Sequence, residues 1–149
     1  MAATLVMFDK WKEEMLLGNV GLSDTFLVAL LSAGWTPSID TSSVTNSLST
    51  YFCASASGGD AIRSLNPPGG GTLSDQVTKT ANGVIKIDFS DVAITASSGV
   101  NMDCQYGVIY PSAGAVPFAY WEISSAAITV SQLSITWPAA GLIETSDNV

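Results

Sequence analysis

The side chains that could perform acid–base chemistry in this sequence are carboxylates, because the chain contains no histidine. Two pairs of acids lie close together along the chain, Asp88 with Asp91 and Glu13 with Glu14. A catalytic acid and base need two carboxyl groups whose surroundings separate their pKa values. Both pairs fit better as solvated groups, at the end of a predicted strand and on the surface of a predicted helix. We therefore expect no enzymatic activity.

The two cysteines, Cys53 and Cys104, could serve as nucleophiles or metal ligands, but they lack the CxxC spacing of such sites. Both lie in stretches of small and apolar residues, which predicts buried side chains with free thiols. The first residues lack the basic start and the long apolar core of a signal peptide, so we expect synthesis inside the cell. The acids are scattered without an EF-hand-like loop, and we expect no metal and no cofactor.

A glycine-rich stretch at residues 57–72, "SGGDAIRSLNPPGGGT", superficially resembles a phosphate-binding loop. No Gly-Lys-Ser/Thr follows it, so the motif is incomplete. Pro67 and Pro68 stand directly before three glycines, and such a run cannot continue a strand. The stretch is predicted to be a surface loop that could reach a partner.

The length suits one domain, or one domain with an arm, and allows a real core. The 149 residues are 47% hydrophobic and only 12% charged, and serine and threonine supply the polar faces of strands. Thirteen acidic and five basic residues give a net charge of −8, which repels polyanions and argues against nucleic acid as a partner. Apolar runs are shorter than the roughly 20 residues that span a bilayer, so membrane insertion is not expected.

The N-terminal residues predict a short amphipathic helix. Leu5, Phe8, Trp11 and Met15 form one apolar stripe, and Gly18 is a typical residue for ending a helix. A helix of about three turns is marginal alone, so this stripe must pack on its own domain or on a neighbouring subunit. We assign residues 1–21 to this helix or arm and residues 22–149 to a β domain.

From residue 22 onward the pattern becomes that of strands. Phe26 to Leu31 are six consecutive apolar residues, which predicts a strand covered on both faces. A long polar loop follows around Trp35 and Pro37, where Trp35 is either tucked beneath the loop or a contact residue. A second strand is predicted from Leu48 to Ala56.

The second half of the chain predicts further strands and two corners. Asn82-Gly83 between two strand-like runs is typical of a tight hairpin. The apolar alternation changes parity after Asp91 and again between Val130 and Leu133, and each change requires a bulge or corner. A short last strand is predicted in "AGLIE". About eight strands after one helix indicate an all-β antiparallel sandwich or barrel.

The order of these segments resembles a family of structural proteins of tailed bacteriophages, described as head decoration, cement or head-fibre proteins. The resemblance depends on "LLGNVGLSDTFLVALLSAGWTPSIDT", and on "IDFSDVAIT", "QYGVIYPSAG" and "LSITWPAAGLIE" further along. It extends from about Met7 to Glu144. The loop at residues 57–72 departs from the family, because it is longer and lacks the tyrosine of the usual Gly-Tyr and Gly-Gly loop.

The resemblance implies an antiparallel β-sandwich of jelly-roll character and a non-enzymatic role on the outer surface of a capsid. The expected partners are the major capsid protein and further copies of the chain, in a dimer or trimer. The expected location is the capsid exterior of a virion assembled in the host cytoplasm. The candidate residues for contact with the capsid or another subunit are Phe8, Trp11, Met15, Trp35, Pro37, Pro67 and Pro68.

Two other functions fit the sequence. A neck or tail component of the virion could have the same sandwich, and its copy number per particle would distinguish it from a shell protein. A carbohydrate-binding module could use Trp35, Trp121 and Trp137 as stacking platforms, although tryptophans on alternating strands more often belong to the core.

Overall fold

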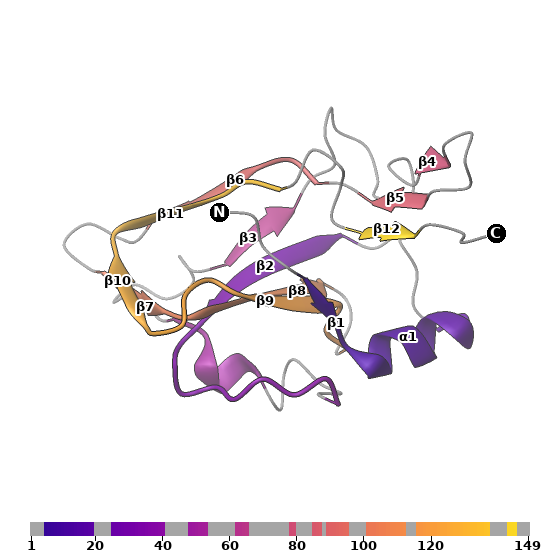
Figure 1. Cartoon of the computed structure of the whole chain (residues 1–149), viewed down its shortest axis with the longest axis horizontal. Coiled ribbons are helices and arrows are strands. Elements are labelled where there is room, and N and C mark those ends of the chain that lie inside the picture. Colours follow the sequence, from indigo (N-terminus) through magenta and orange to yellow (C-terminus); the bar gives the residue numbers. More distant parts are fainter. Residues whose placement is uncertain are drawn as a thin grey trace.

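The computed structural model of the chain (Figure 1) describes residues 5–19, 25–40, 48–53, 62–65, 78–79, 85–87, 89–95, 101–112, 116–137 and 143–145. Within these ranges the fold is mostly β, with antiparallel sheets and one short helix near the N-terminus. The elements are β1 (Val6–Met7), α1 (Asp9–Leu16), β2 (Phe26–Leu31), the 3₁₀ helix η2 (Ser49–Tyr51), β3 (Ile62–Leu65), β4 (Thr78–Lys79), β5 (Ile85–Ile87), β6 (Val92–Thr95), β7 (Met102–Cys104), β8 (Tyr106–Pro111), β9 (Ala119–Glu122), β10 (Ile128–Val130), β11 (Gln132–Ile135) and β12 (Ile143–Thr145).

A five-stranded antiparallel sheet forms the centre of the molecule, with the strand order β1-β9-β8-β2-β3. The central strands β2 and β8 pair along their whole length, from Phe26 opposite Pro111 to Leu31 opposite Tyr106. In each of these strands five of the six residues are buried and the sixth is half-buried. A strand can be apolar on both faces only if both faces are covered, so the predicted strand Phe26–Leu31 is confirmed.

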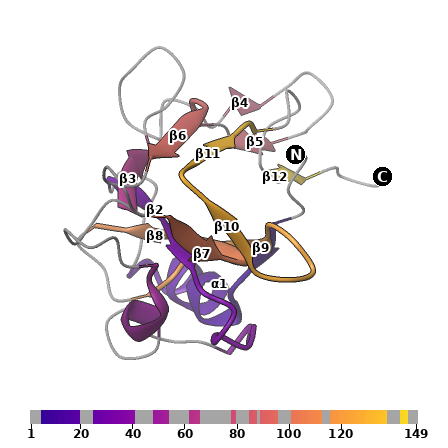
Figure 2. The same ribbon diagram turned by 90° about the vertical axis from the view of Figure 1, so that its left-hand side faces the viewer.

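One face of the central sheet is covered by the ribbon of β6 and β11. The register places Phe26 of β2 and Trp121 of β9 on the same face, because opposite residues of antiparallel strands point the same way. The ring of Phe89, just before β6, lies 6.0 Å from Phe26, and the ring of Trp137, just after β11, lies 5.5 Å from Trp121. Figures 1 and 2 both show β6 and β11 as a layer above the central sheet.

The other face of the central sheet is covered by the segment that follows β2. The indole of Trp35 meets the rings of Tyr106 and Tyr120 edge-on, each at 5.2 Å. Further along the same segment, Phe52 stacks on Tyr110 at 5.8 Å. Loop residues and a 3₁₀ turn therefore complete the core on this side, within the described residues, and Trp35 is tucked beneath its loop.

The two predicted changes of parity coincide with changes of strand partner. β5 pairs with β4 and β12, whereas β6, which begins five residues after Ile87, pairs with β11. Likewise β10 pairs with β7 and β11 pairs with β6, with Ser131 as the single residue between them. The corner at Ser131 shifts the alternation of inward and outward side chains by one residue. Figure 2 shows the chain passing from β10, beside the central sheet, up to β11 in the covering layer. Both corners are confirmed.

Two segments differ from the prediction. Leu48–Cys53 does not form a strand: Ser49–Tyr51 is a 3₁₀ helix, and only an isolated bridge joins Phe52 to Leu31. The reason is competition for one edge, because β3 pairs with β2 from Phe26 to Ala29 and leaves little room. The same pairing corrects the loop predicted at residues 57–72, since Ile62–Leu65 within it is strand β3.

The predicted hairpin and the predicted last strand are present as pairings. β4 and β5 are antiparallel, with Lys79 opposite Ile85, and β12 pairs with the other edge of β5. The Asn82-Gly83 turn itself lies outside the described residues. Together β4, β5 and β12 form a small three-stranded sheet beside the ribbon of β6 and β11 (Figure 1).

The N-terminal helix is shorter than its predicted stripe. Val6 and Met7 pair with β9 as strand β1, so α1 begins only at Asp9, whose backbone N–H donates to the Ile39 carbonyl. Trp11 is the one buried residue of α1. The stripe therefore packs on its own domain, and it ends at Trp11, because Met15 one turn later is exposed.

Candidate functional site

The described carboxylates of the predicted acid pairs have structural partners. The carboxylate of Asp91 accepts a hydrogen bond of 3.0 Å from the backbone N–H of Trp137, and the Trp137 indole N–H donates to the Ser90 carbonyl at 3.0 Å. These two bonds hold the end of β11 against the start of β6. Asp88 lies outside the described residues, so its pairing with Asp91 stays a prediction.

Glu13 and Glu14 are both bound by the same cation on α1. The ammonium group of Lys10 lies 2.9 Å from a carboxylate oxygen of Glu13 and 2.7 Å from one of Glu14. The hydrogen bonds that Lys10 donates to Glu14 and Glu13 raise the pKa of Lys10. The bonds that Glu14 accepts from Lys10 and Asn19 lower the pKa of Glu14. Carboxylates bound to one exposed ammonium group form a surface ion pair, and the lowered pKa of Glu14 is the opposite of what a general acid needs.

The described residues contain no group of three or more acidic, histidine or cysteine side chains that could hold a metal ion. Nor does the described part of the chain include a helix with the length and apolar character that crossing a bilayer demands.

Both cysteines are free and buried in the core. The thiol of Cys53 donates a hydrogen bond of 3.0 Å to the Asp103 carbonyl. Burial raises the pKa of Cys53 to about 12 and that of Cys104 to about 11. A thiol is nucleophilic only as the thiolate, so both side chains act as small apolar residues of the core.

We expect iodoacetamide at pH 8.5 to leave both thiols of the folded protein unlabelled and to label both in denaturant.

Raising the pH should also destabilise the fold between about 9, the pKa of an unperturbed thiol, and about 12. In that window the unfolded chain releases thiol protons that the folded chain retains, so the free energy of unfolding falls as the pH rises. Mass spectrometry measures the labelling and urea titration the stability. Equal labelling rates in folded and unfolded protein would contradict the burial.

Three of the predicted contact residues lie in the core of the chain itself. Phe8 and Trp11 have no exposed surface, and Trp35 is 5% exposed. Trp11 meets Phe26 and Phe118 edge-on, at 5.8 and 5.2 Å. Their burial is explained by packing within the chain itself and gives no support to a role in contact with a partner. Trp121 and Trp137, offered as platforms for sugars together with Trp35, are likewise only 3% and 5% exposed.

The other predicted contact residues fall in different environments. Met15 is 45% exposed, and Pro37 is half-buried. Pro67 and Pro68 lie outside the described residues, so their contact role stays a prediction.

Sequence reasoning missed the most exposed apolar side chains of the described chain. Leu16 is 85% exposed and Leu17 is 63% exposed, and they follow Met15 directly. We call Met15, Leu16 and Leu17 the α1 patch. The signal was present, because Leu16 and Leu17 lie off the stripe that contains Phe8 and Trp11, and a helix apolar on a second side needs a second neighbour.

The end of α1 is held by a complete C-terminal cap. The backbone N–H of Asn19 donates to the Glu14 carbonyl, and that of Gly18 donates to the Met15 carbonyl. This is the Schellman pattern, and it requires the left-handed conformation that Gly18 adopts with φ of 75°. The predicted helix end at Gly18 is confirmed.

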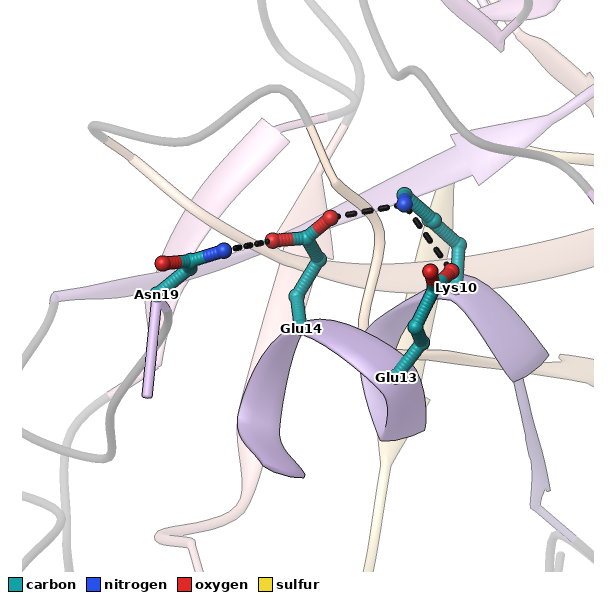
Figure 3. Close-up of polar contacts among 4 residues, drawn as sticks. All are labelled: Lys10, Glu13, Glu14 and Asn19. Atoms are coloured by element: carbon teal, nitrogen blue, oxygen red, sulfur yellow. Dashed lines mark hydrogen bonds and ion pairs between the residues drawn. The ribbon is translucent and has the colours of Figure 1, made fainter. Parts of the chain in front are cut away.

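Side chains reinforce this cap (Figure 3). The amide of Asn19 donates to one oxygen of Glu14 at 2.6 Å, and the other oxygen of Glu14 binds the Lys10 ammonium group. Residues of the first turn, the last turn and the cap are thus joined in one line along the helix. The α1 patch therefore sits on a defined backbone and not on a frayed end.

Comparison of the chain with protein-family models, curated proteins and solved structures found no match.

Proposed function

We propose that this chain is a non-enzymatic structural protein of a bacteriophage virion that binds the outer surface of the capsid and stabilises it. The observation that carries the proposal is a pairing of two features. The antiparallel β body is packed on both faces of its central sheet, while Leu16 and Leu17, the most exposed apolar side chains of the described residues, lie at one capped helix end. Such a molecule is suited to adhesion by surface contact.

The packing of the body suits a mechanical role. Aromatic rings connect the layers of the core, from Trp11 through Phe26 and Phe89 to Trp137 and Trp121. Close-packed interiors transmit strain without large deformation. We extend the fold proposal to a sandwich of jelly-roll character, supported by the ribbon of β6 and β11 over the central sheet and by the strands that change partner at corners.

The expected partners are the major capsid protein and other copies of this chain, in a dimer or trimer. The net charge of −8 suits the outside of a shell better than its DNA-facing interior, because packaged DNA repels an acidic surface. Many copies on one particle would add modest contacts into strong attachment. Assembly would take place in the host cytoplasm.

The test compares heads with and without this protein. Heads from a phage whose gene for the chain is deleted should rupture at a lower temperature than complete heads. When the salt concentration is lowered stepwise, they should also rupture earlier, at a higher remaining ionic strength. Adding the purified chain should restore resistance in both tests. Light scattering and DNA release measure rupture. Identical thresholds in all three preparations would refute stabilisation of the capsid.

The same particles distinguish the alternative location. A shell protein is expected in hundreds of copies per virion and a neck or tail protein in roughly a dozen, in keeping with closed symmetric assemblies. Quantitative gel densitometry of purified virions decides between these numbers. About a dozen copies would move the proposal from the capsid to the neck or tail.

A further inference from the structure

The two cysteines of the chain, Cys53 and Cys104, meet in the core although they are far apart in the sequence. The thiol of Cys53 donates to the carbonyl oxygen of Asp103 at 3.0 Å, across a separation of 50 residues. This oxygen belongs to the peptide group that joins Asp103 to Cys104. The thiol of one cysteine therefore contacts the peptide group that carries the other.

The hydrogen bond limits the distance between the two residues. With standard bond lengths, the path from the Cα of Cys53 through its sulfur and the Asp103 oxygen to the Cα of Cys104 measures at most about 9 Å. Bond angles bend this path and shorten the distance between its ends, and a disulfide joins Cα atoms about 4.4–6.8 Å apart. The pKa of Cys53 is raised first by burial and next by the charge of Cys104, so the two sulfurs are near enough to interact.

The two cysteines belong to different parts of the fold. The backbone N–H of Cys53 donates to the Leu30 carbonyl, so Cys53 lies against β2 of the central sheet. Its segment meets β2 through an isolated bridge between Phe52 and Leu31 and not through a regular strand. Cys104 ends β7, which is paired with β10 in a separate sheet. A covalent bond between the sulfurs would fix a weakly paired segment to a strand of the β body.

We propose that Cys53 and Cys104 form a dithiol site that oxidation converts into a disulfide, which ties residues 48–53 to β7. The inference goes beyond the proposed function and does not depend on it. Each thiol loses one hydrogen atom and the two sulfurs become joined, while a small disulfide such as oxidised glutathione is reduced to two thiols. In a reducing compartment the site stays a pair of core thiols, and in an oxidising one it closes.

Cys53 is the sulfur that reacts first. It is 7% exposed, whereas Cys104 has no exposed surface. Because burial raises its pKa, Cys53 becomes a thiolate only when residues 48–53 open or before the chain has folded. The thiolate attacks the oxidant, forms a mixed disulfide and releases one glutathione. When the segment closes, the sulfur of Cys104 attacks Cys53, and the second glutathione leaves with the proton of Cys104.

The experiment incubates the purified full chain with oxidised glutathione and, separately, refolds it from urea in the same buffer. Mass spectrometry of the monomer should show the loss of two hydrogen atoms, and digestion without reductant should give Cys53 and Cys104 in one linked product. The bond closes a loop of about 50 residues, so the melting temperature followed by circular dichroism should rise by roughly 5–15 °C over the reduced protein.

Cys104→Ala is the matched variant, because it keeps the thiol that reacts first. After refolding in the same oxidant it should gain one glutathione at Cys53, without the rise in melting temperature. A rise as large as that of the wild type would overturn the inference, because the variant cannot form the bond.

The wild-type chain decides the question even if Cys104→Ala does not fold. The inference is overturned if the refolded wild type keeps both thiols, takes up two glutathiones, or becomes linked to a second copy. It is also overturned if the two cysteines are joined but the melting temperature stays the same or falls, because the folded chain would then have to be strained to bring them together.

Discussion

Replacing Trp11 by alanine is expected to lower the free energy of unfolding by about 3–5 kcal/mol. Trp11 has no exposed surface, and its ring packs against Phe26 and Phe118. It is also the one buried residue of α1, and an eight-residue helix is not stable without tertiary contacts. The substitution should therefore release the helix as well as open a cavity. Urea unfolding followed by tryptophan fluorescence and circular dichroism measures both effects.

The matched control for Trp11→Ala is Leu16→Ala in the same helix. Leu16 is 85% exposed, so its truncation should change the free energy of unfolding by no more than about 0.5 kcal/mol. Equal stability of Trp11→Ala and the wild type would mean that the helix packs elsewhere. In that case Trp11 would again be a candidate for contact with a partner.

Replacing Gly107 by alanine is the second substitution with a large expected effect. Gly107 lies opposite Trp121 across the β8–β9 pair, and an added Cβ would overlap the indole ring of Trp121. The ring is buried and is held by Trp137 at 5.5 Å, so it cannot simply swing into solvent. Overpacking of this kind typically costs about 1–3 kcal/mol, and we expect the upper end or more, measured by urea unfolding.

Two further variants show whether the overlap is the cause. Gly34→Ala adds the same methyl group where the nearest atoms, of Ser32 and Tyr51, are 3.7 Å away, so it should be tolerated. In a Trp121→Leu background, Gly107→Ala should cost much less than in the wild type, because the overlapping ring is gone. An undiminished cost in that background would show that Gly107 is needed for another reason.

Much of the fold could be predicted from local patterns. The apolar run Phe26–Leu31 predicted a strand buried on both faces, since only such a position allows six apolar residues in succession. The parity changes near Asp91 and Val130 predicted corners, because alternation records which face is buried. The segment Leu48–Cys53 was predicted wrongly, because its pattern cannot show that β3 already occupies most of the edge of β2.

The candidate site was harder to predict than the fold. An apolar stripe shows that Trp11 must be buried, but it does not show whether the covering surface belongs to the same chain. The structure assigns that surface to Phe26 and Phe118, which are distant in sequence. Leu16 and Leu17 attracted no prediction, although their position off the Trp11 stripe was visible in the sequence, because how far each side chain is exposed depends on the whole fold.

The five-stranded sheet ends, as far as the structure describes it, in two very short strands. β1 contains two residues and β3 contains four, whereas the long apolar strands β2 and β8 are enclosed between neighbours. Long open edges recruit strands from other molecules and lead to amyloid-like polymers. At the ends of this sheet, copies crowded side by side would therefore offer one another only short edges on which such polymerisation could start.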